Sequence, residues 1–223
     1  MIPGAIVFEF PKDFFGGLWV TVQISALGLA GALIIGTGIA LLRVSPLRPL
    51  RWIGAAYVEF FRNTPLVVQL FFLFLGLPLI GFRFASDTFD NIFRAACVGM
   101  ALYHGAYVAE IVRGGLLGVD KGQIEAARSL GLSYVQMLRF VQLPQTFRSI
   151  VPPLGNIAIA LVKNTSLAST IGVADLLFGA EVVESRTFRA EEGFGAATVL
   201  YLFLTGPLGF AVNALERRML IAR

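Results

Sequence analysis

Apolar residues occur along this chain in five long blocks, separated by shorter polar connections. Each block can cross a hydrocarbon layer about 30 Å thick as a helix that rises about 1.5 Å per residue. The blocks lack the alternation of apolar and polar positions that is typical of membrane-spanning strands, so a β-barrel is excluded. The pattern predicts an all-α membrane protein with five transmembrane helices, at residues 15–42, 55–81, 93–117, 150–180 and 195–215.

The composition supports the same conclusion. Hydrophobic residues make up 57% of the chain and charged residues only 14%, whereas about a quarter of the residues in a soluble domain are charged. The single cysteine, Cys97, excludes an internal disulfide. A net charge of +4 would suit a nucleic-acid partner, but the basic residues stand in short clusters between the apolar blocks, which is typical of membrane topology. We therefore expect membrane lipid around the chain and no nucleic acid.

The charged connections also predict the orientation of the chain. Basic residues are more frequent after the first and third blocks and at the C-terminus than in the other connections. Because basic loops stay in the cytoplasm, we expect the C-terminus inside and the N-terminus outside. Acidic residues are common in the outer segments, where they form either a docking face for an external partner or a solvated rim. We divide the chain into an N-terminal interfacial segment, a single transmembrane domain and a cytoplasmic tail: residues 1–14, 15–215 and 216–223.

One cytoplasmic connection, residues 118–149, is too polar to span a membrane but is patterned as two short helices. Asp120 can cap the first helix, and Gly131 ends it because glycine tolerates the left-handed conformation that follows many helices. Ser133 can cap the second helix, and Pro144 is expected to stop it because proline cannot donate the hydrogen bond that continues a helix. The connection is therefore predicted to fold as a helical hairpin on the cytoplasmic face.

This hairpin carries the most specific motif of the sequence. It reads Glu-Ala-Ala at 125–127, glycine at 131 and Val-Gln-Leu-Pro at 141–144, with three and nine residues between these groups. The pattern resembles the EAA loop of permeases of ATP-binding-cassette (ABC) importers, in which isoleucine is commoner at the position of Val141. The resemblance implies that the loop, residues 120–144, rests in a groove of a separate ATPase and passes its movement to the membrane helices. The coupling residues that it implies are Glu125, Ala126, Ala127, Arg128 and Gly131.

Three further segments are similar to the polar amino acid group of these permeases, at residues 61–72, 109–115 and 160–167. The resemblance implies a type I importer permease fold in the inner membrane of a prokaryote. The Arg-Asn-Thr-Pro sequence at 62–65 is similar to members that carry glutamate, aspartate or glutamine, and importers of basic amino acids in the same family are the alternative. The implied partners are two copies of a cytoplasmic ATP-binding subunit, a second permease chain, identical or not, and an extracytoplasmic amino-acid-binding protein.

Polar residues inside the apolar blocks mark a candidate substrate path. A charge at the centre of a bilayer costs at least about 2.5 kcal/mol, so such residues usually face a protein interior or a cavity. Lys163 is central in the fourth block, and the Asn-Thr-Ser that follows can interrupt the helix; alternatively, Lys163 reaches the interface or pairs structurally. Glu110 and Arg113 share a helix face and are expected to pair, whereas His104 is expected only to pack or form a hydrogen bond. The predicted path residues are Asn63, Thr64, Asn156, Lys163, Asn164 and Thr165.

Two other classes of protein can be compared with a transport subunit. An enzyme would need a nucleophile or metal motif, and the HExxH, GxSxG and Walker A patterns are absent from the sequence. No catalytic residue, metal or cofactor is therefore expected, and ATP is expected to bind only to the partner subunit. An ATP-independent secondary transporter is the other alternative, but it would have no use for the hairpin at this spacing.

Overall fold

The computed structural model describes residues 5–221, and most of them are helical. These residues contain no β-strand, as expected for an all-α membrane protein. Two short segments are π-helical and one is a 3-10 helix. In chain order the elements are α1 (Ala5–Glu9), α2 (Pro11–Val44), α3 (Arg48–Asn63), α4 (Leu66–Phe71), the π-segment η1 (Phe72–Gly76), α5 (Leu77–Leu79), α6 (Thr88–Leu117), α7 (Lys121–Ser129), α8 (Tyr134–Met137), the π-segment η2 (Leu138–Gln142), α9 (Leu143–Asn164), the 3-10 helix η3 (Thr165–Ile171), α10 (Leu176–Thr187) and α11 (Ala190–Ile221).

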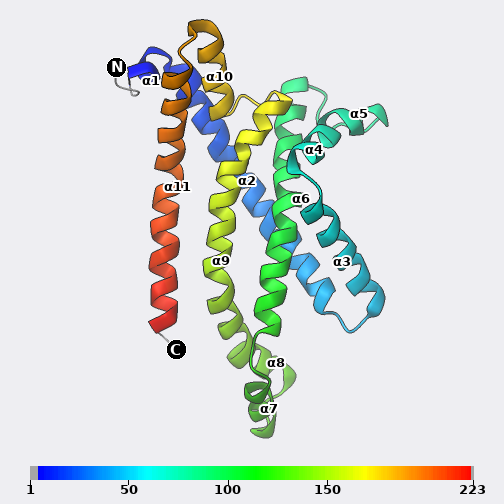
Figure 1. The fold of residues 1–223 in the computed structure, drawn as a ribbon. Coiled ribbons are helices and arrows are strands. Elements are labelled where there is room, and N and C mark those ends of the chain that lie inside the picture. Colours follow the sequence, from blue (N-terminus) through cyan, green and yellow to red (C-terminus); the bar gives the residue numbers. More distant parts are fainter. Residues whose placement is uncertain (1–4, 222–223) are drawn as a thin grey trace.

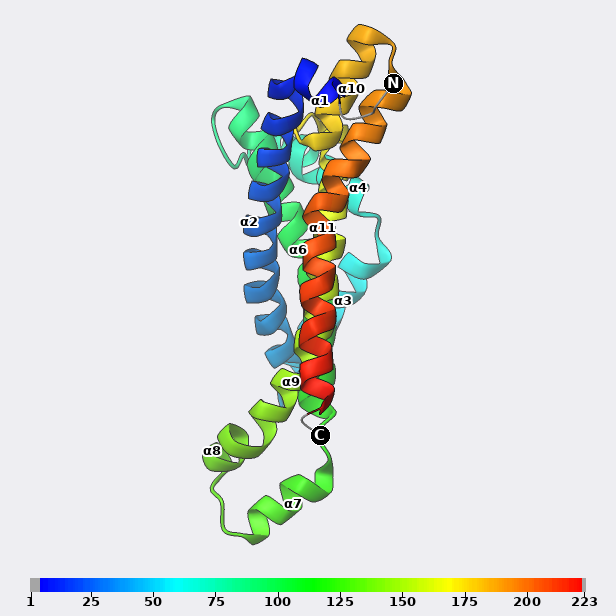
Figure 2. The same cartoon turned by 90° about the vertical axis from the view of Figure 1, so that its left-hand side faces the viewer.

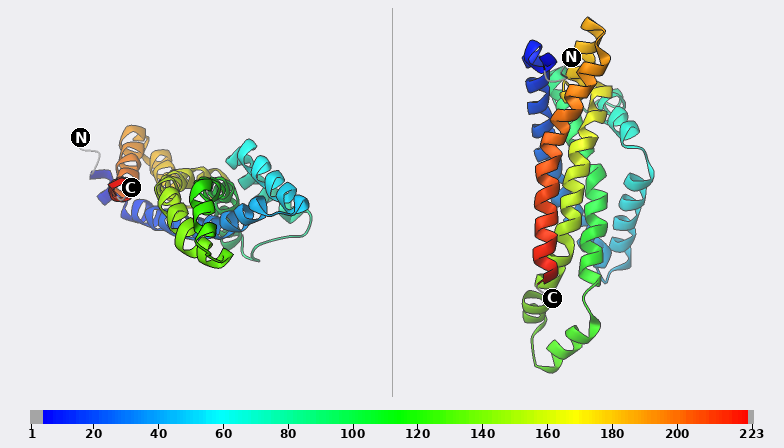
Figure 3. Two further views of the ribbon diagram at one scale, coloured as in Figure 1. Left: turned by 90° about the horizontal axis from the view of Figure 1, so that it is seen from below. Right: turned by 60° about the vertical axis from the view of Figure 1, so that its left-hand side comes forward.

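The long helices lie in an elongated bundle (Figures 1 and 2). Helices α2, α6, α9 and α11 run along its length, and α3 leans outward from them. The hairpin of α7 and α8 projects at one end of the bundle, and α1 and α10 lie at the other; we call these the hairpin end and the α10 end. The described chain begins at the α10 end and finishes near the hairpin end, as Figure 3 also shows. The two ends of the chain therefore lie at opposite ends of the bundle.

The five predicted membrane crossings correspond to three continuous helices and two broken ones. Helices α2, α6 and α11 are long and apolar enough to cross a membrane, and three of the predicted blocks lie within them. The block 55–81 is wrong as a single helix, because α3 begins at Arg48 and meets the α4–α5 segment at an angle of 105°. The break occurs at Thr64, since Pro65 drives the preceding residue out of the helical conformation. The block 150–180 is also broken, by 49°, before α10.

Small residues bring α2 and α6 into close contact. The buried face of α2 carries glycine or alanine at 28, 32, 36 and 40, and a Cβ atom added to Gly28 would lie 2.9 Å from the Cβ of Met100 on α6. Lipid tails are as apolar as the side chains, so helices in a membrane associate largely through such close packing. The pair α2–α6 therefore forms the centre of the bundle, against which α3, α9 and α10 pack.

Ion pairs at the α10 end connect α1 with the loop before α11 and with the start of α11. Arg189 Nη1 lies 2.6 Å from Oε2 of Glu9, and Nη2 lies 2.5 Å from Oε2 of Glu192, so the loop before α11 is tied to α1. The hydrogen bonds that the Arg189 guanidinium donates to Glu192 and Glu9 raise its pKa. Ile6 of α1 is fully buried against α10 and α11. Within the predicted interfacial segment 1–14, Ile6, Val7 and Phe14 are buried against the bundle, and residues 1–4 lie outside the described range.

The last helix continues past Leu215 at the hairpin end. Helix α11 continues to Ile221, so residues 216–221 of the predicted cytoplasmic tail are helical and continuous with the last span. No glycine or proline stands between Leu215 and Ile221 to end the helix. Residues 222–223 lie outside the described range.

Candidate functional site

Side-chain caps begin both helices of the hairpin, as the sequence predicted. The carboxylate of Asp120 accepts a hydrogen bond of 2.7 Å from the backbone N–H of Gly122 at the start of α7. Ser133 begins α8 with a reciprocal capping box, in which the Ser133 N–H donates to Oε1 of Gln136 at 2.9 Å and the Gln136 N–H donates to the Ser133 hydroxyl. These bonds satisfy donors that a helix start leaves free. The hairpin is therefore encoded locally.

The turn between the two helices depends on Gly131. This residue has a φ of 77°, the left-handed conformation in which other residues are strained. Its N–H donates to the carbonyl of Arg128, and the N–H of Leu132 donates to the carbonyl of Ala127. The two bonds form the Schellman arrangement that closes a helix end. The predicted role of Gly131 as the end of the first helix is confirmed.

Pro144 does not stop the second helix, and that prediction is wrong. From Tyr134 the chain stays helical through η2 into α9, which ends at Asn164. Pro144 occupies the first turn of α9, where a missing N–H does not break a hydrogen bond of that helix. The π-segment η2 changes the hydrogen-bond register just before it. The hairpin is thus joined directly to a membrane helix, without a flexible linker.

The predicted coupling residues point in two directions. Glu125, Ala126 and Arg128 are exposed, as is Gly131, whereas Ala127 is buried with 5% of its surface exposed. Ala127 packs inward, so Ala126 is the alanine that a partner can approach. Leu130 is 80% exposed at the end of α7 and was not among the predicted residues. An exposed leucine beside the motif has no sequence signal of its own, because periodicity cannot assign a face to so short a helix.

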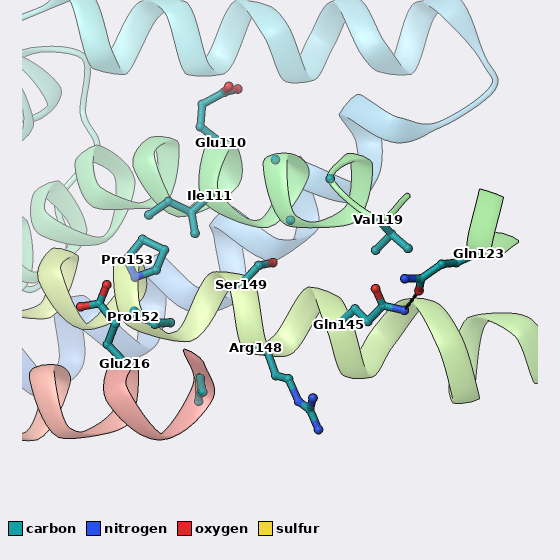
Figure 4. A pocket seen from close by; sticks show the side chains of 14 residues that line it. Glu110, Ile111, Val119, Gln123, Gln145, Arg148, Ser149, Pro152, Pro153 and Glu216 are labelled. Carbon is teal, nitrogen blue, oxygen red and sulfur yellow. Dashed lines mark hydrogen bonds between the residues drawn. The ribbon is translucent and has the colours of Figure 1, made fainter. Parts of the chain in front are cut away.

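Three side-chain hydrogen bonds connect the hairpin, the start of α9 and the end of α6. Gln145 of α9 donates to the Gln123 oxygen of α7 at 2.5 Å (Figure 4). Gln142 donates to the carbonyl of Leu116 at 3.1 Å, and Thr146 donates to the carbonyl at position 115 at 3.2 Å, both at the end of α6. Beside these bonds, a cavity of about 810 Å³ lies between α6, α9 and the end of α11. The hairpin therefore has firm contacts to α6 and α9, while α11 is separated from α6 by open space.

The first break in a span places polar groups inside the bundle. Thr64 donates to the carbonyl of Phe60 at 2.8 Å. Gln69 is 7% exposed, and its amide nitrogen reaches the Thr64 hydroxyl at 2.7 Å and the carbonyl of Phe61 at 3.1 Å. Asn63 is exposed and bonds Oε2 of Glu59 at 2.8 Å. Gln69 therefore donates to carbonyl groups that the break leaves without helical partners. Sequence analysis did not single out Gln69, although a glutamine four residues after a proline in an apolar run is a signal for such a role.

Helix α9 changes into the 3-10 helix η3 at Thr165, ahead of the bend that separates η3 from α10. Asn156 and Lys163 are exposed and seven residues apart, so they share one face of α9. Asn164 is half-buried and donates to Nε2 of His104 at 3.1 Å. Thr165 is fully buried, and its hydroxyl donates to the carbonyl of Val162, so its side chain does not reach this face. The expected interruption after Lys163 is confirmed.

A cluster of charges joins α2 to α6. Glu110 Oε2 accepts a hydrogen bond of 2.9 Å from Arg113, as the sequence predicted. The other oxygen, Oε1, forms an ion pair with Arg43 of α2. Only 18% of the Arg43 side chain and 23% of the Glu110 side chain are exposed. The pairing of Arg43 could not be predicted, because the two segments are far apart in the sequence.

We expect Glu110→Ala to lower the free energy of unfolding by about 2 kcal/mol, because two partly buried guanidinium groups lose their counter-ion. The matched control is Asp90→Ala on the same helix, which removes an exposed pair with Arg94 and should change stability by less than about 1 kcal/mol. The measurement is the thermal unfolding midpoint of the purified protein in one detergent. Equal shifts for both variants would contradict this account of the cluster.

Comparison with known proteins assigns the fold to a family. Residues 32–221 match the family described as "Binding-protein-dependent transport system inner membrane component". The chain belongs to this family. A solved structure titled "Crystal structure of an amino acid ABC transporter with histidines" superposes on the permease with a TM-score of 0.87 and 34% identity, covering 96% of this chain and 97% of that one. The expected importer permease fold is therefore confirmed.

Two curated relatives are similar to the permease over nearly its whole length. The "Glutamine transport system permease protein GlnP" of Escherichia coli is 40% identical and covers 92% of each chain. The "Glutamate transport system permease protein GluC" of Corynebacterium glutamicum is also 40% identical, over 92% of this chain and 93% of its own. The permease is a multi-pass component of the inner membrane and a transport subunit.

Proposed function

We propose that the permease forms the translocation path of an ATP-driven importer of polar amino acids, with glutamine, glutamate or aspartate as substrate. The observation that carries the proposal is the hairpin, where α7 presents the small Ala126 between the charged Glu125 and Arg128 beyond the end of the bundle. A small exposed side chain lets a partner's groove approach the helix closely, and the flanking charges meet its rim. The names of the glutamine and glutamate relatives support the substrate class.

The hairpin transmits force because it is attached at several points. A displacement of α7 is passed to α9 through the bond between Gln123 and Gln145. It reaches the end of α6 through the bonds of Gln142 and Thr146. The continuous helix through η2 into α9 gives a further rigid connection. Hydrolysis of ATP on two partner subunits thus rearranges α6 and α9 around the path.

Orientation and partners follow from the two ends of the bundle. We place the hairpin end and the C-terminus in the cytoplasm, next to the ATP-binding subunits, and the N-terminus outside. An extracytoplasmic binding protein then delivers the amino acid to the α10 end. Basic residues near the hairpin end, among them Lys121 and Arg128, support this orientation.

The substrate path is assigned to the polar face of α9 and to the break between α3 and α4. Asn156 and Lys163 are exposed in this single chain, and such groups are costly against lipid. They therefore face a second permease chain across an aqueous path. Asn63 and Thr64 lie at the break of the other span, where interrupted helices offer backbone and side-chain polar groups to a zwitterion.

The proposal is tested by uptake into proteoliposomes that contain the permease, the ATPase subunits and the binding protein. We expect uptake of glutamine or glutamate only with ATP on the cytoplasmic side, and competition by arginine or histidine to be weak. Uptake that is driven by an ion gradient without ATP would contradict the proposal. Strong competition by arginine would assign the substrate to the basic amino acids.

We expect Lys163→Ala to raise the KM for uptake about tenfold, because a charge-assisted hydrogen bond to the substrate carboxylate is lost. The control is Lys163→Arg, which keeps the positive charge and should stay within about threefold of the original KM. Substrate-dependent uptake rates measure both. An unchanged KM in Lys163→Ala would remove Lys163 from the path.

A further inference from the structure

His104 occupies a defined position between α6 and α9. Its side chain is 2% exposed, and both ring nitrogens have partners: Nδ1 lies 3.0 Å from the carbonyl of Met100, and Nε2 lies 3.1 Å from the amide nitrogen of Asn164. Tyr103 packs edge-on against the ring, with centroids 5.1 Å apart. Met100 is fully buried on α6, so the imidazole is anchored to the centre of the bundle.

These two contacts select one tautomer of His104. A carbonyl oxygen only accepts hydrogen bonds, so Nδ1 carries the proton. None of the ion pairs among the described residues involves His104, and an unpaired buried imidazolium is costly. The ring is therefore neutral, and Nε2 is an acceptor. This state requires that the amide nitrogen of Asn164, not its oxygen, faces the ring.

The orientation of the amide determines where its oxygen points. With the nitrogen of Asn164 held by His104, Oδ1 lies on the opposite side of the amide group. This oxygen forms no hydrogen bond with any described residue. It also keeps some accessible surface, so a ligand can reach it. Asn164 is the last residue of α9 and follows the exposed Lys163. A free acceptor and a cationic side chain thus belong to consecutive residues at the end of α9, and these two kinds of group complement the ammonium and carboxylate of an amino acid zwitterion.

We infer that His104 is a positioning residue for the substrate: it holds the Asn164 amide so that Oδ1 accepts a hydrogen bond from the α-ammonium group of the transported amino acid. The inference rests on the proposed substrate path and adds a residue that does not itself touch the substrate. Without His104, the Asn164 amide can rotate about its side-chain bonds and loses the preferred orientation. The affinity of the path then falls, while coupling through the distant hairpin is unaffected.

The test measures the KM and the maximal rate of ATP-driven uptake by the full transporter in proteoliposomes. Asn164→Ala should raise KM about tenfold, since a hydrogen bond to a charged group is lost. His104→Leu should raise KM about threefold to tenfold, with a maximal rate and an ATPase rate close to the original. His104→Gln, whose amide oxygen can accept from Asn164, should restore most of the affinity.

A double variant separates positioning from general packing. If His104 acts through Asn164, adding His104→Leu to Asn164→Ala should raise KM no further, whereas independent effects would multiply. Independent effects, or an unchanged KM in His104→Leu alone, overturn the inference. If Asn164→Ala itself leaves KM unchanged while uptake stays ATP-dependent, the assignment of Asn164 to the path fails and the inference fails with it.

A spectroscopic measurement decides the case if His104→Leu does not assemble. His104 is the only histidine of the chain, so the difference between nitrogen-15 spectra of histidine-labelled transporter and of the His104→Gln variant isolates its ring. A protonated Nδ1 with an unprotonated Nε2 supports the inference. A protonated Nε2 overturns it, because the Asn164 oxygen would then face the ring.

Discussion

Ala126→Arg is expected to reduce ATP-driven uptake by about 30-fold or more, the size of effect that a side chain at the centre of an interface produces. Ala126 is exposed on α7, beyond the bundle, so the substitution leaves the folded permease intact. A long charged side chain at this position keeps the helix from entering the groove of the ATPase. Uptake and ATPase activity of the reconstituted complex measure the loss.

Two controls accompany this variant. Ala126→Ser keeps the small size and should retain most of the uptake. Phe89→Arg introduces the same charge at a residue that is 81% exposed near the start of α6, away from the hairpin, and should retain coupling. Full uptake in Ala126→Arg would show that the exposed face of α7 does not contact the ATPase.

Gly36→Val is expected to give a large loss of stability in the membrane bundle. A Cβ atom at this position would lie 2.5 Å from the Cβ of Val108 and 2.6 Å from the carbonyl oxygen of Gly105. Backbone atoms cannot move aside cheaply, so α2 and α6 must separate. Overpacking of this kind costs about 3 kcal/mol, and the thermal unfolding midpoint should fall by about 5 °C or more.

The matched control lies two residues further along the same helix. A Cβ atom at Gly38 meets nothing within 4 Å, so Gly38→Val changes the same residue type without a clash. Its unfolding midpoint and yield should remain close to those of the original protein. A similar loss in both variants would indicate that the helix needs glycine for another reason than close packing.

Features that depend on neighbours in the sequence were predictable. Asp120 and Ser133 cap helices whose free donors lie within three residues, and Gly131 adopts the left-handed turn that few other residues tolerate. The apolar blocks also located the membrane helices, because hydrophobic length reports directly on the bilayer. The helical hairpin that carries the motif at 125–144 was predictable too, because its caps and its turn depend on nearby residues.

Features that depend on the hydrogen-bond register of a helix or on packing between distant segments were not predictable. Pro144 was expected to end a helix, but η2 shifts the register so that the proline fits the first turn of α9. Ala126 and Ala127 are equivalent in sequence, and only the fold separates the exposed one from the buried one. The contact between His104 and Asn164 joins residues sixty positions apart. Patterns of hydrophobicity carry no information about such pairs.

The most direct test of the account is the accessibility of the hairpin to a membrane-impermeant thiol reagent. Leu130→Cys in a Cys97→Ser background places a single cysteine at a position that is 80% exposed. The account predicts labelling in inside-out vesicles, no labelling in right-side-out vesicles, and protection when the ATPase subunits are bound. Labelling from the outer side, or labelling that the ATPase does not reduce, would contradict the claim that a cytoplasmic ATPase drives the bundle through this hairpin.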